Sequence, residues 1–168
     1  MNIHGARSPW WRWPVLACAT GGFSSYLVSR GGERERGAAT LGTLVGFACL
    51  PLLPVQRWSW LVVLVCATAA AAVIIHCAQQ WLSVPDDPRI VLDEIVGGWA
   101  AVAWLPRTWP YVVAAFLLFR LFDIWKPGVI RAVQAWPGSW GILADDLLAG
   151  LLTNFLLQGV AAIMRGMA

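Results

Sequence analysis

The chain has 168 residues, about the length of one domain, with 12 basic residues, 9 acidic residues and a net charge of +3. Only 12% of the residues are charged and 59% are hydrophobic, whereas a soluble domain usually has about 25% charged residues. This composition argues against a soluble globular domain and against a disordered chain. The basic residues are scattered singly or in pairs without a nucleic-acid-binding motif, so we expect no nucleic-acid partner.

Apolar segments follow one another along the chain. The first, 15–28, is interrupted by glycines and serines, and we expect a weakly hydrophobic helix that either spans a membrane or lies at its surface. A membrane-spanning helix needs about 20 mostly apolar residues. The further apolar segments are 38–55, which two prolines break, 58–83, which is the surest span, 95–105 and 111–119, which a Pro-rich turn at 106–110 joins, and 147–164.

The predicted fold is therefore all-α: a polytopic helical membrane protein with about four to five membrane segments and a short central helical hairpin. Many of the 12 tryptophans flank the apolar segments, as indole rings do at membrane surfaces. Following the chain across the bilayer places all nine acidic residues on one side, together with seven basic residues and a loop at 127–141. The positive-inside rule makes that side cytoplasmic, and Arg57, Arg107 and Arg165 lie on the other side.

Two acidic doublets begin similar segments. Asp93-Glu94 precedes Ile-Val-Gly-Gly, and Asp145-Asp146 precedes Leu-Leu-Ala-Gly at the expected start of the last helix. Residues four apart share a helix face, and small residues allow close helix approach in lipid, so these helices could face one another with four carboxylates between them. Such carboxylates are costly unless paired or metal-bound, and oxygen ligands favour Mg²⁺, Mn²⁺ or Ca²⁺. We expect a divalent-metal site; the alternative is compensation of helix dipoles.

A second element surrounds one carboxylate with two cations. Arg120, Asp123 and Lys126 are three residues apart, and Pro127 ends their helix. Arginine offers a planar fork and lysine a point charge to phosphate oxygens, so we expect an anionic group to bind here. The alternative is a salt-bridge cluster at the membrane surface.

Two weaker signals complete the candidate site. Thr40 and Thr43 begin an apolar helix, where hydroxyls and free N–H groups can hold phosphate or cap the helix. His76 lies inside an apolar helix, where packing is its more usual role, and we retain it as a residue that supports the metal ligands from outside.

In these residues the chain resembles the phosphatidylglycerophosphatase A family of small bacterial inner-membrane lipid phosphatases. The resemblance covers about residues 76–150. Its motifs are Asp86-x6-Asp93-Glu94, Phe119-Arg120-x2-Asp123-x2-Lys126-Pro127 and Gly141-Ile142-x2-Asp145-Asp146-x2-Ala149-Gly150. Residues 38–43 depart from the family's Pro-Gly-Thr-x-Gly-Ser pattern, because Ala38-Ala39 replace Pro-Gly. We therefore expect one domain over 1–168, with a divergent N-terminal segment and loop at 1–36 and a core at 38–165.

The resemblance implies Mg²⁺-dependent removal of phosphate from phosphatidylglycerophosphate, which gives phosphatidylglycerol, at the cytoplasmic face of the bacterial inner membrane. It assigns Mg²⁺ binding to Asp93, Glu94, Asp145 and Asp146 and phosphate binding to Arg120, Lys126, Thr40 and Thr43. Asp123 would be a further ligand or the base that orients water, and Asp86 joins the catalytic set with Asp123, Arg120 and Lys126. The sequence makes no prediction of oligomeric state.

Two other functions remain open from the sequence. One is a divalent-cation transporter or channel with an acidic vestibule, which ranks lower because the acidic residues gather at one face and the hairpin is otherwise apolar. The other is a catalytically inactive membrane scaffold, which the loss of Pro-Gly at 38–39 supports slightly.

Overall fold

The computed structural model describes residues 9–28, 35–82 and 87–167. Every regular element in these ranges is helical, which confirms the predicted all-α class. The α-helices are α1 (Arg12–Ala19), α2 (Glu35–Ala48), α3 (Arg57–Gln79), α4 (Leu92–Val102), α5 (Trp109–Trp125), α6 (Gly128–Gln134) and α7 (Ser139–Gly166). Two short 3₁₀ helices, η1 (Ser24–Leu27) and η2 (Leu50–Leu52), follow α1 and α2.

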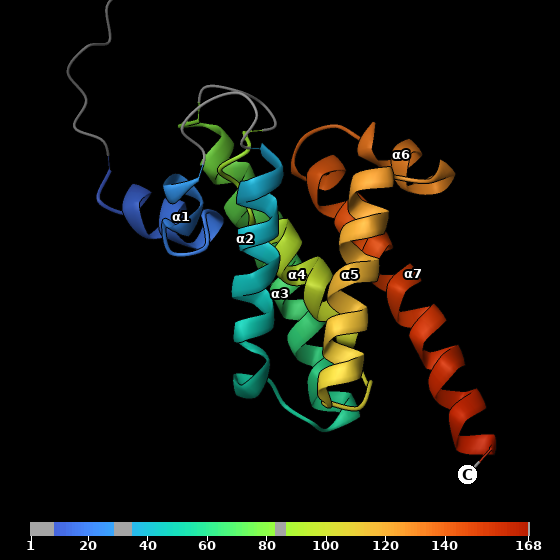
Figure 1. The fold of residues 1–168 in the computed structure, drawn as a ribbon. Helices are drawn as coiled ribbons and strands as arrows, with labels where there is room; N and C mark the ends of the chain where they lie inside the picture. The colour runs from blue at the N-terminus through green and yellow to red at the C-terminus, as the bar shows by residue number, and fades with distance from the viewer. Residues whose placement is uncertain (1–8, 29–34, 83–86, 168) are drawn as a thin grey trace, which may run out of the picture.

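The long helices alternate in direction (Figure 1). Helices α2, α4 and α7 begin at one end of the bundle, which we call the acidic end, and α3 and α5 return to it from the opposite end. Helix α4 is central, since it contacts α2, α3, α5 and α7. The alternation agrees with the path that the sequence predicted.

Two helices are long and apolar enough to cross a membrane: α3 with 23 residues and α7 with 28 residues. The others are shorter, and α4 has only 11 residues, a rise of about 16 Å at about 1.5 Å per residue. The hairpin of α4 and α5 is thus central and short, as predicted. By length and composition, only two of the predicted membrane segments are supported among the described residues.

The N-terminal segment does not cross the bundle. Helix α1 has eight residues, a rise of about 12 Å against a hydrocarbon core of about 30 Å. Gly21 and Gly22 then turn the chain at positive φ angles of 58° and 69°. Leu16 and Ala19 pack with Ala78 near the end of α3. Of the two alternatives for residues 15–28, a spanning helix is therefore wrong.

Residues 127–141 are not wholly a loop, contrary to the prediction. They contain α6, whose Ile130 is buried in a cluster with Ala101, Phe119 and Ala149. The stretch is rich in glycine, proline and tryptophan, but Ile130 and Val133 are three residues apart on one buried helix face. Tertiary packing of that face explains the helix.

Small residues bring the central helices together. A Cβ atom added at Gly150 of α7 would lie 2.2 Å from the carbonyl oxygen of Gly97 on α4. One added at Gly97 would lie 2.7 Å from the carbonyl oxygen of Asp146. On the other side of α4, a Cβ added at Gly46 of α2 would lie 3.0 Å from Cα of Ile95. The close approach predicted from the small residues is confirmed.

The C-terminal end of α4 is capped by side chains of α7. Asn154 Nδ2 donates to the carbonyl oxygens of Ala101 at 3.1 Å and Ala103 at 2.7 Å, and Gln158 Nε2 donates to Ala103 at 3.1 Å. The last carbonyls of a helix lack an intrahelical donor, and lipid supplies none. These amides therefore allow the short helix α4 to end inside the protein.

Candidate active site

A pocket of about 280 Å³ lies at the acidic end. Residues of α2, α4, α5, α6 and α7 and of the segment before α4 line it. The ionisable residues among them are Asp87, Asp93, Glu94, Arg120, Asp123, Lys126, Asp145 and Asp146. Segments far apart in the sequence thus bring their carboxylates to one place, as predicted. Asp86, a predicted catalytic residue, lies outside the described residues.

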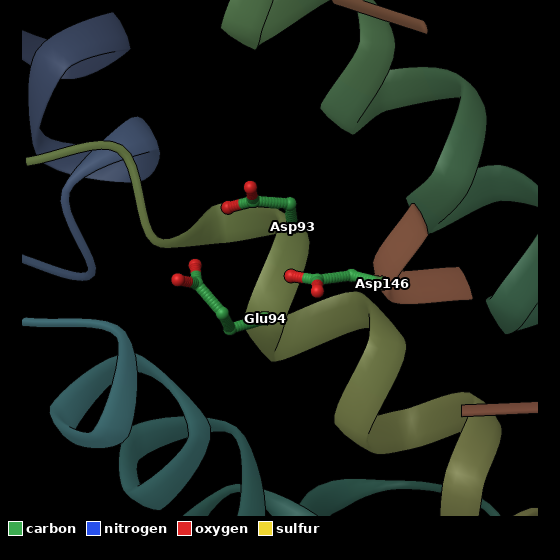
Figure 2. A group of neighbouring side chains, drawn as sticks. All are labelled: Asp93, Glu94 and Asp146. Atoms are coloured by element: carbon green, nitrogen blue, oxygen red, sulfur yellow. The ribbon is translucent and has the colours of Figure 1, made fainter. Parts of the chain in front are cut away.

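Three carboxylates form the centre of this pocket. Asp93 and Glu94 extend from α4 and Asp146 from α7, and their side chains point toward a shared space (Figure 2). One oxygen atom of each lies within 4.8 Å of the others. All three residues are buried, and Asp93 Oδ1 and Glu94 Oε2 have no hydrogen-bond partner in the described part of the chain. A divalent cation fits this set, because it would pair these buried oxygen atoms with positive charge.

Dipole compensation does not explain both doublets. Asp93 and Glu94 lie in the first turn of α4, but α7 begins at Ser139, six residues before Asp145. The prediction that Asp145-Asp146 begins the last helix is therefore wrong. Because the helix dipole acts mainly within the first turn, the burial of Asp145 and Asp146 needs another explanation.

Arg120 and Asp123 form an ion pair on α5, at the spacing noted in the sequence. Arg120 is 7% exposed, and its NH1 group donates to Asp123 Oδ2. Its Nε atom is buried and has no partner among the described residues. The guanidinium thus holds Asp123, and its Nε donor is left without a partner among the described residues.

Lys126 ends α5 and pairs with Asp145. Its φ angle is 46°, its N–H donates to Phe122 at 2.8 Å, and its ammonium donates to Asp145 Oδ2. Burial alone would lower the pKa of Lys126, but the hydrogen bond and negative charge of Asp145 outweigh it and raise the pKa above its ordinary value. Lys126 is therefore a fixed positive charge in the pocket.

This pairing separates Asp145 from the other predicted metal ligands. Its Oδ2 accepts from Lys126 and its Oδ1 accepts from the backbone N–H of Asp146 at 3.0 Å. Both oxygen atoms thus have partners, and Asp145 is not part of the three-carboxylate cluster. Its role as a metal ligand stays a prediction.

The segment before α4 is anchored by a local ion pair. Arg89 Nε donates to Asp87 Oδ1 at 2.7 Å, and its NH2 donates to Asp87 Oδ2 at 2.6 Å. Burial alone would raise the pKa of Asp87, but the hydrogen bonds and charge of Arg89 outweigh it and lower the pKa. Ser25 Oγ donates to the Arg89 carbonyl at 2.7 Å, and the Val91 N–H donates to Ala19 at 2.9 Å. The N-terminal segment therefore fixes the start of α4.

Three predicted residues do not line the pocket. Thr43 is fully buried, and its hydroxyl donates to the Ala39 carbonyl at 3.0 Å, so it packs within the bundle. Thr40 is half-buried on α2. Its neighbour Ala39 lines the pocket, but Thr40 does not. His76 is exposed on α3. The predicted supporting role of His76 and the predicted phosphate-binding role of Thr43 thus have no support in the described geometry.

Two polar residues of the lining, Asp87 and Gln134, are not among the site residues predicted from the sequence. Asp87 could have been found, because an arginine two residues along the chain can pair with it. No sequence pattern marks Gln134, because it reaches the pocket from α6, a helix that the sequence did not predict.

Comparison with known proteins decides the family. The family described as Phosphatidylglycerophosphatase A matches residues 24–161. The chain belongs to this family. The resemblance carried by the three motifs is therefore confirmed, and the match extends beyond them at both ends.

Three bacterial relatives agree with this membership. A phosphatidylglycerophosphatase A of Escherichia coli is 33% identical over 124 residues, which cover 69% of this chain and 71% of the relative. One of Haemophilus influenzae is 34% identical over 112 residues, with 66% and 68% covered. A Bacteroides thetaiotaomicron protein named "Putative phosphatidylinositol-3-phosphatase" is 36% identical over 138 residues, with 76% and 82% covered. No solved structure matches the chain.

Membership in the phosphatidylglycerophosphatase A family establishes the enzyme class. The chain is a phosphoric monoester hydrolase of phospholipid metabolism, as predicted. The transporter and scaffold alternatives are not favoured. The long apolar helices α3 and α7 are consistent with a membrane protein.

Proposed function

We propose that this protein removes the terminal phosphate of phosphatidylglycerophosphate and yields phosphatidylglycerol and inorganic phosphate, with Mg²⁺ as cofactor. The observation that carries the proposal is the buried cluster of Asp93, Glu94 and Asp146 beside Arg120 and Lys126 in one pocket. Family membership supports the lipid substrate, since two relatives carry the name of this activity.

Asp93, Glu94 and Asp146 would hold the Mg²⁺ ion. When bound, the ion supplies positive charge that stabilises the transferring phosphoryl group. The unpartnered oxygen atoms of Asp93 and Glu94 support this assignment. Asp145 remains a candidate fourth ligand, although its present partner is Lys126.

The remaining side chains act on the substrate itself. Lys126 and Arg120 bind the phosphate oxygens, the first as a point charge and the second through its planar fork. Asp123, which Arg120 holds in place, accepts a hydrogen bond from the attacking water and takes its proton. The oxygen of that water bonds to phosphorus as the bond to the glycerol oxygen breaks. The proton taken by Asp123 then passes to that glycerol oxygen, so the products are an alcohol and inorganic phosphate.

We further propose that the bundle crosses the bacterial inner membrane several times with its acidic end at the cytoplasmic face. Exposed tryptophans at both ends support this orientation along the membrane normal: Trp58 and Trp109 at the opposite end, and Trp125, Trp136 and Trp140 at the acidic end. Arg57, Arg107 and Arg165 line one cavity at the opposite end. Among the described residues of the bundle, more basic side chains lie at the acidic end (Arg89, Arg120, Lys126 and Arg131) than at the opposite end, and the positive-inside rule assigns the more basic end to the cytoplasm.

The test is phosphate release from phosphatidylglycerophosphate by the purified full chain in detergent, with Mg²⁺ or with a chelator. The wild type should be active only with Mg²⁺. Asp93→Asn, Asp123→Asn and Asp146→Asn should each lose about three orders of magnitude in turnover or more, while their helical circular dichroism stays unchanged. Wild-type-like turnover in any two of these variants would defeat the assignment.

A further inference from the structure

A second cavity, lined by the same helices α2 and α5 as the acidic pocket, is apolar. It is a groove of about 670 Å³ between α2 and α5. Two helix faces form most of its walls, with Leu44, Phe47 and Ala48 on α2 and Val112, Val113 and Phe116 on α5. Arg107 and Trp109 lie at the end of the groove that is farther from the acidic pocket. The groove is thus lined almost wholly by apolar side chains, and Arg107 is the single charged residue among those that line it.

The groove and the acidic pocket lie along the same face of α5. Trp109, Val112, Val113 and Phe116 line the groove, and Arg120 lines the pocket. Each of these residues is three or four positions from one in the adjacent turn, which places them along one helix face. From Phe116 to Arg120 is one helical turn, about 6 Å.

Helix α2 shows the same succession. Its Ala39 lines the acidic pocket, and Leu44 and Phe47 line the groove. The rings of Phe47 and Phe116 meet edge to face with their centres 5.7 Å apart, so the two helices touch beside the groove. One pair of helices therefore lines both the polar pocket at the acidic end and the apolar groove farther along the bundle.

We propose that this groove binds an acyl chain of the lipid substrate while the phosphate headgroup occupies the acidic pocket. The proposal rests on the proposed function. The part of α5 from Trp109 to Phe116 rises about 10 Å, a length that fits within one leaflet of about 15 Å, half of the hydrocarbon core.

The groove acts by position rather than by hydrophobic attraction. Lipid tails are as apolar as leucine, so a chain gains little by moving from bilayer to groove. A chain held along α5 instead places the glycerol end of the lipid one turn from Arg120. Ordering a substrate in this way raises the rate of the chemical step.

A matched pair of variants tests the groove. Val113 is 49% exposed and lines the groove, while Leu117 is 61% exposed on the same helix and does not line it. Val113→Trp should therefore fill the groove with little effect on the core, and Leu117→Trp is the control. The substrates are dioleoyl phosphatidylglycerophosphate and its short-chain dibutanoyl analogue.

Val113→Trp should lower kcat/KM for the dioleoyl lipid by about tenfold or more and leave the dibutanoyl analogue unaffected. Leu117→Trp should leave both unchanged. Equal losses on the two substrates, no loss with Val113→Trp, or the same selective loss with Leu117→Trp would overturn the proposal.

A binding measurement separates this proposal from the proposed function. A phosphate-headed lipid with a photoreactive diazirine in its acyl chain is cross-linked to the full chain, and the labelled residues are mapped by mass spectrometry. Labels should concentrate on the groove residues of α2 and α5 and decrease there in Val113→Trp. Even labelling of all exposed apolar helix faces would overturn the groove as a site. Groove labelling without phosphate release from either substrate would support the groove and contradict the proposed function.

Discussion

The two ends of α4 bury polar groups in different ways. At its C-terminal end, Asn154 and Gln158 donate to backbone carbonyls of residues 101 and 103. At its N-terminal end, Asp93 Oδ1 and Glu94 Oε2 are buried without a partner among the described residues. Trp60 Nε1 and Thr153 Oγ1, farther along the bundle, are also unpartnered but belong to neutral side chains.

This difference distinguishes a structural polar site from a ligand site. A buried neutral group that is hydrogen-bonded costs little, whereas a buried unpaired carboxylate costs far more. The amides of α7 complete α4 within the protein itself. The carboxylates at the other end have no such partners within the described residues, which is why we propose metal binding and catalysis at that end.

The largest effect is expected from removing a cation from the acidic end. Lys126→Gln should lower kcat/KM for phosphatidylglycerophosphate by about a hundredfold, roughly 2.7 kcal/mol of transition-state stabilisation, because the phosphate loses a fixed positive charge. Arg131→Gln is the control, since Arg131 is exposed on α6 and does not line the pocket. Equal activity of the two variants would contradict the assigned role of Lys126.

A smaller effect, on stability, is expected from separating α4 and α7. Gly150→Ala places a methyl group 2.2 Å from the carbonyl oxygen of Gly97 and should lower the free energy of unfolding by about 1–3 kcal/mol. Gly159→Ala on the same helix meets nothing within 4 Å and should not destabilise. Unfolding in detergent, followed by circular dichroism, compares the two, and equal stability would show that the close approach is not essential.

At the C-terminal end of α4, substitutions should lower the free energy of unfolding according to the number of hydrogen bonds that they remove, and should leave the catalysed reaction intact. Asn154→Ala removes two hydrogen bonds to buried carbonyls and should cost about 1–2 kcal/mol of unfolding free energy. Gln158→Ala removes one bond and should cost less. Both variants should keep near-normal kcat once folded. A large fall in kcat with unchanged stability would show that the two ends are not as distinct as the geometry indicates.

The smallest expected effect concerns pH and the anchor before α4. Arg89 lowers the pKa of Asp87 below its ordinary value of 3.8, so the ion pair stabilises the fold fully above that value and loses its contribution as the pH falls through the lowered pKa. The stability difference between wild type and Asp87→Asn should thus be constant from about pH 7 to about pH 5 and shrink below about pH 4. A difference that grows in acid would have the wrong sign.

Much of the fold could be predicted because apolar periodicity and alternating direction are local properties. The acidic doublets, the small residues four positions later and the Pro127 stop gave the α4, α5 and α7 elements and the convergence of their charges. Helix α6 could not be predicted from its Pro- and Gly-rich composition, since its stability comes from the packing of Ile130. The place of α1 likewise depends on its contact with α3.

The site was predicted less completely than the fold. Spacing along the chain identified Asp93, Glu94, Asp145 and Asp146 but could not show that Asp145 pairs with Lys126. In the structure, Lys126 reaches Asp145 from a left-handed backbone position at the end of α5. Thr43 carries a suitable hydroxyl group, but the neighbouring helix buries it, and this burial cannot be read from a single helix.

The most direct test of the central claim is metal binding to the purified protein, measured by the paramagnetic resonance of Mn²⁺. Asp93→Asn and Asp146→Asn should each weaken binding by about a hundredfold or more, since even residues that only support metal ligands contribute about tenfold to a hundredfold. Asp87→Asn should bind like the wild type, because Asp87 lines the same pocket but its carboxylate is held by Arg89. Equal Mn²⁺ affinity in all four proteins, or the same loss in Asp87→Asn, would contradict the account.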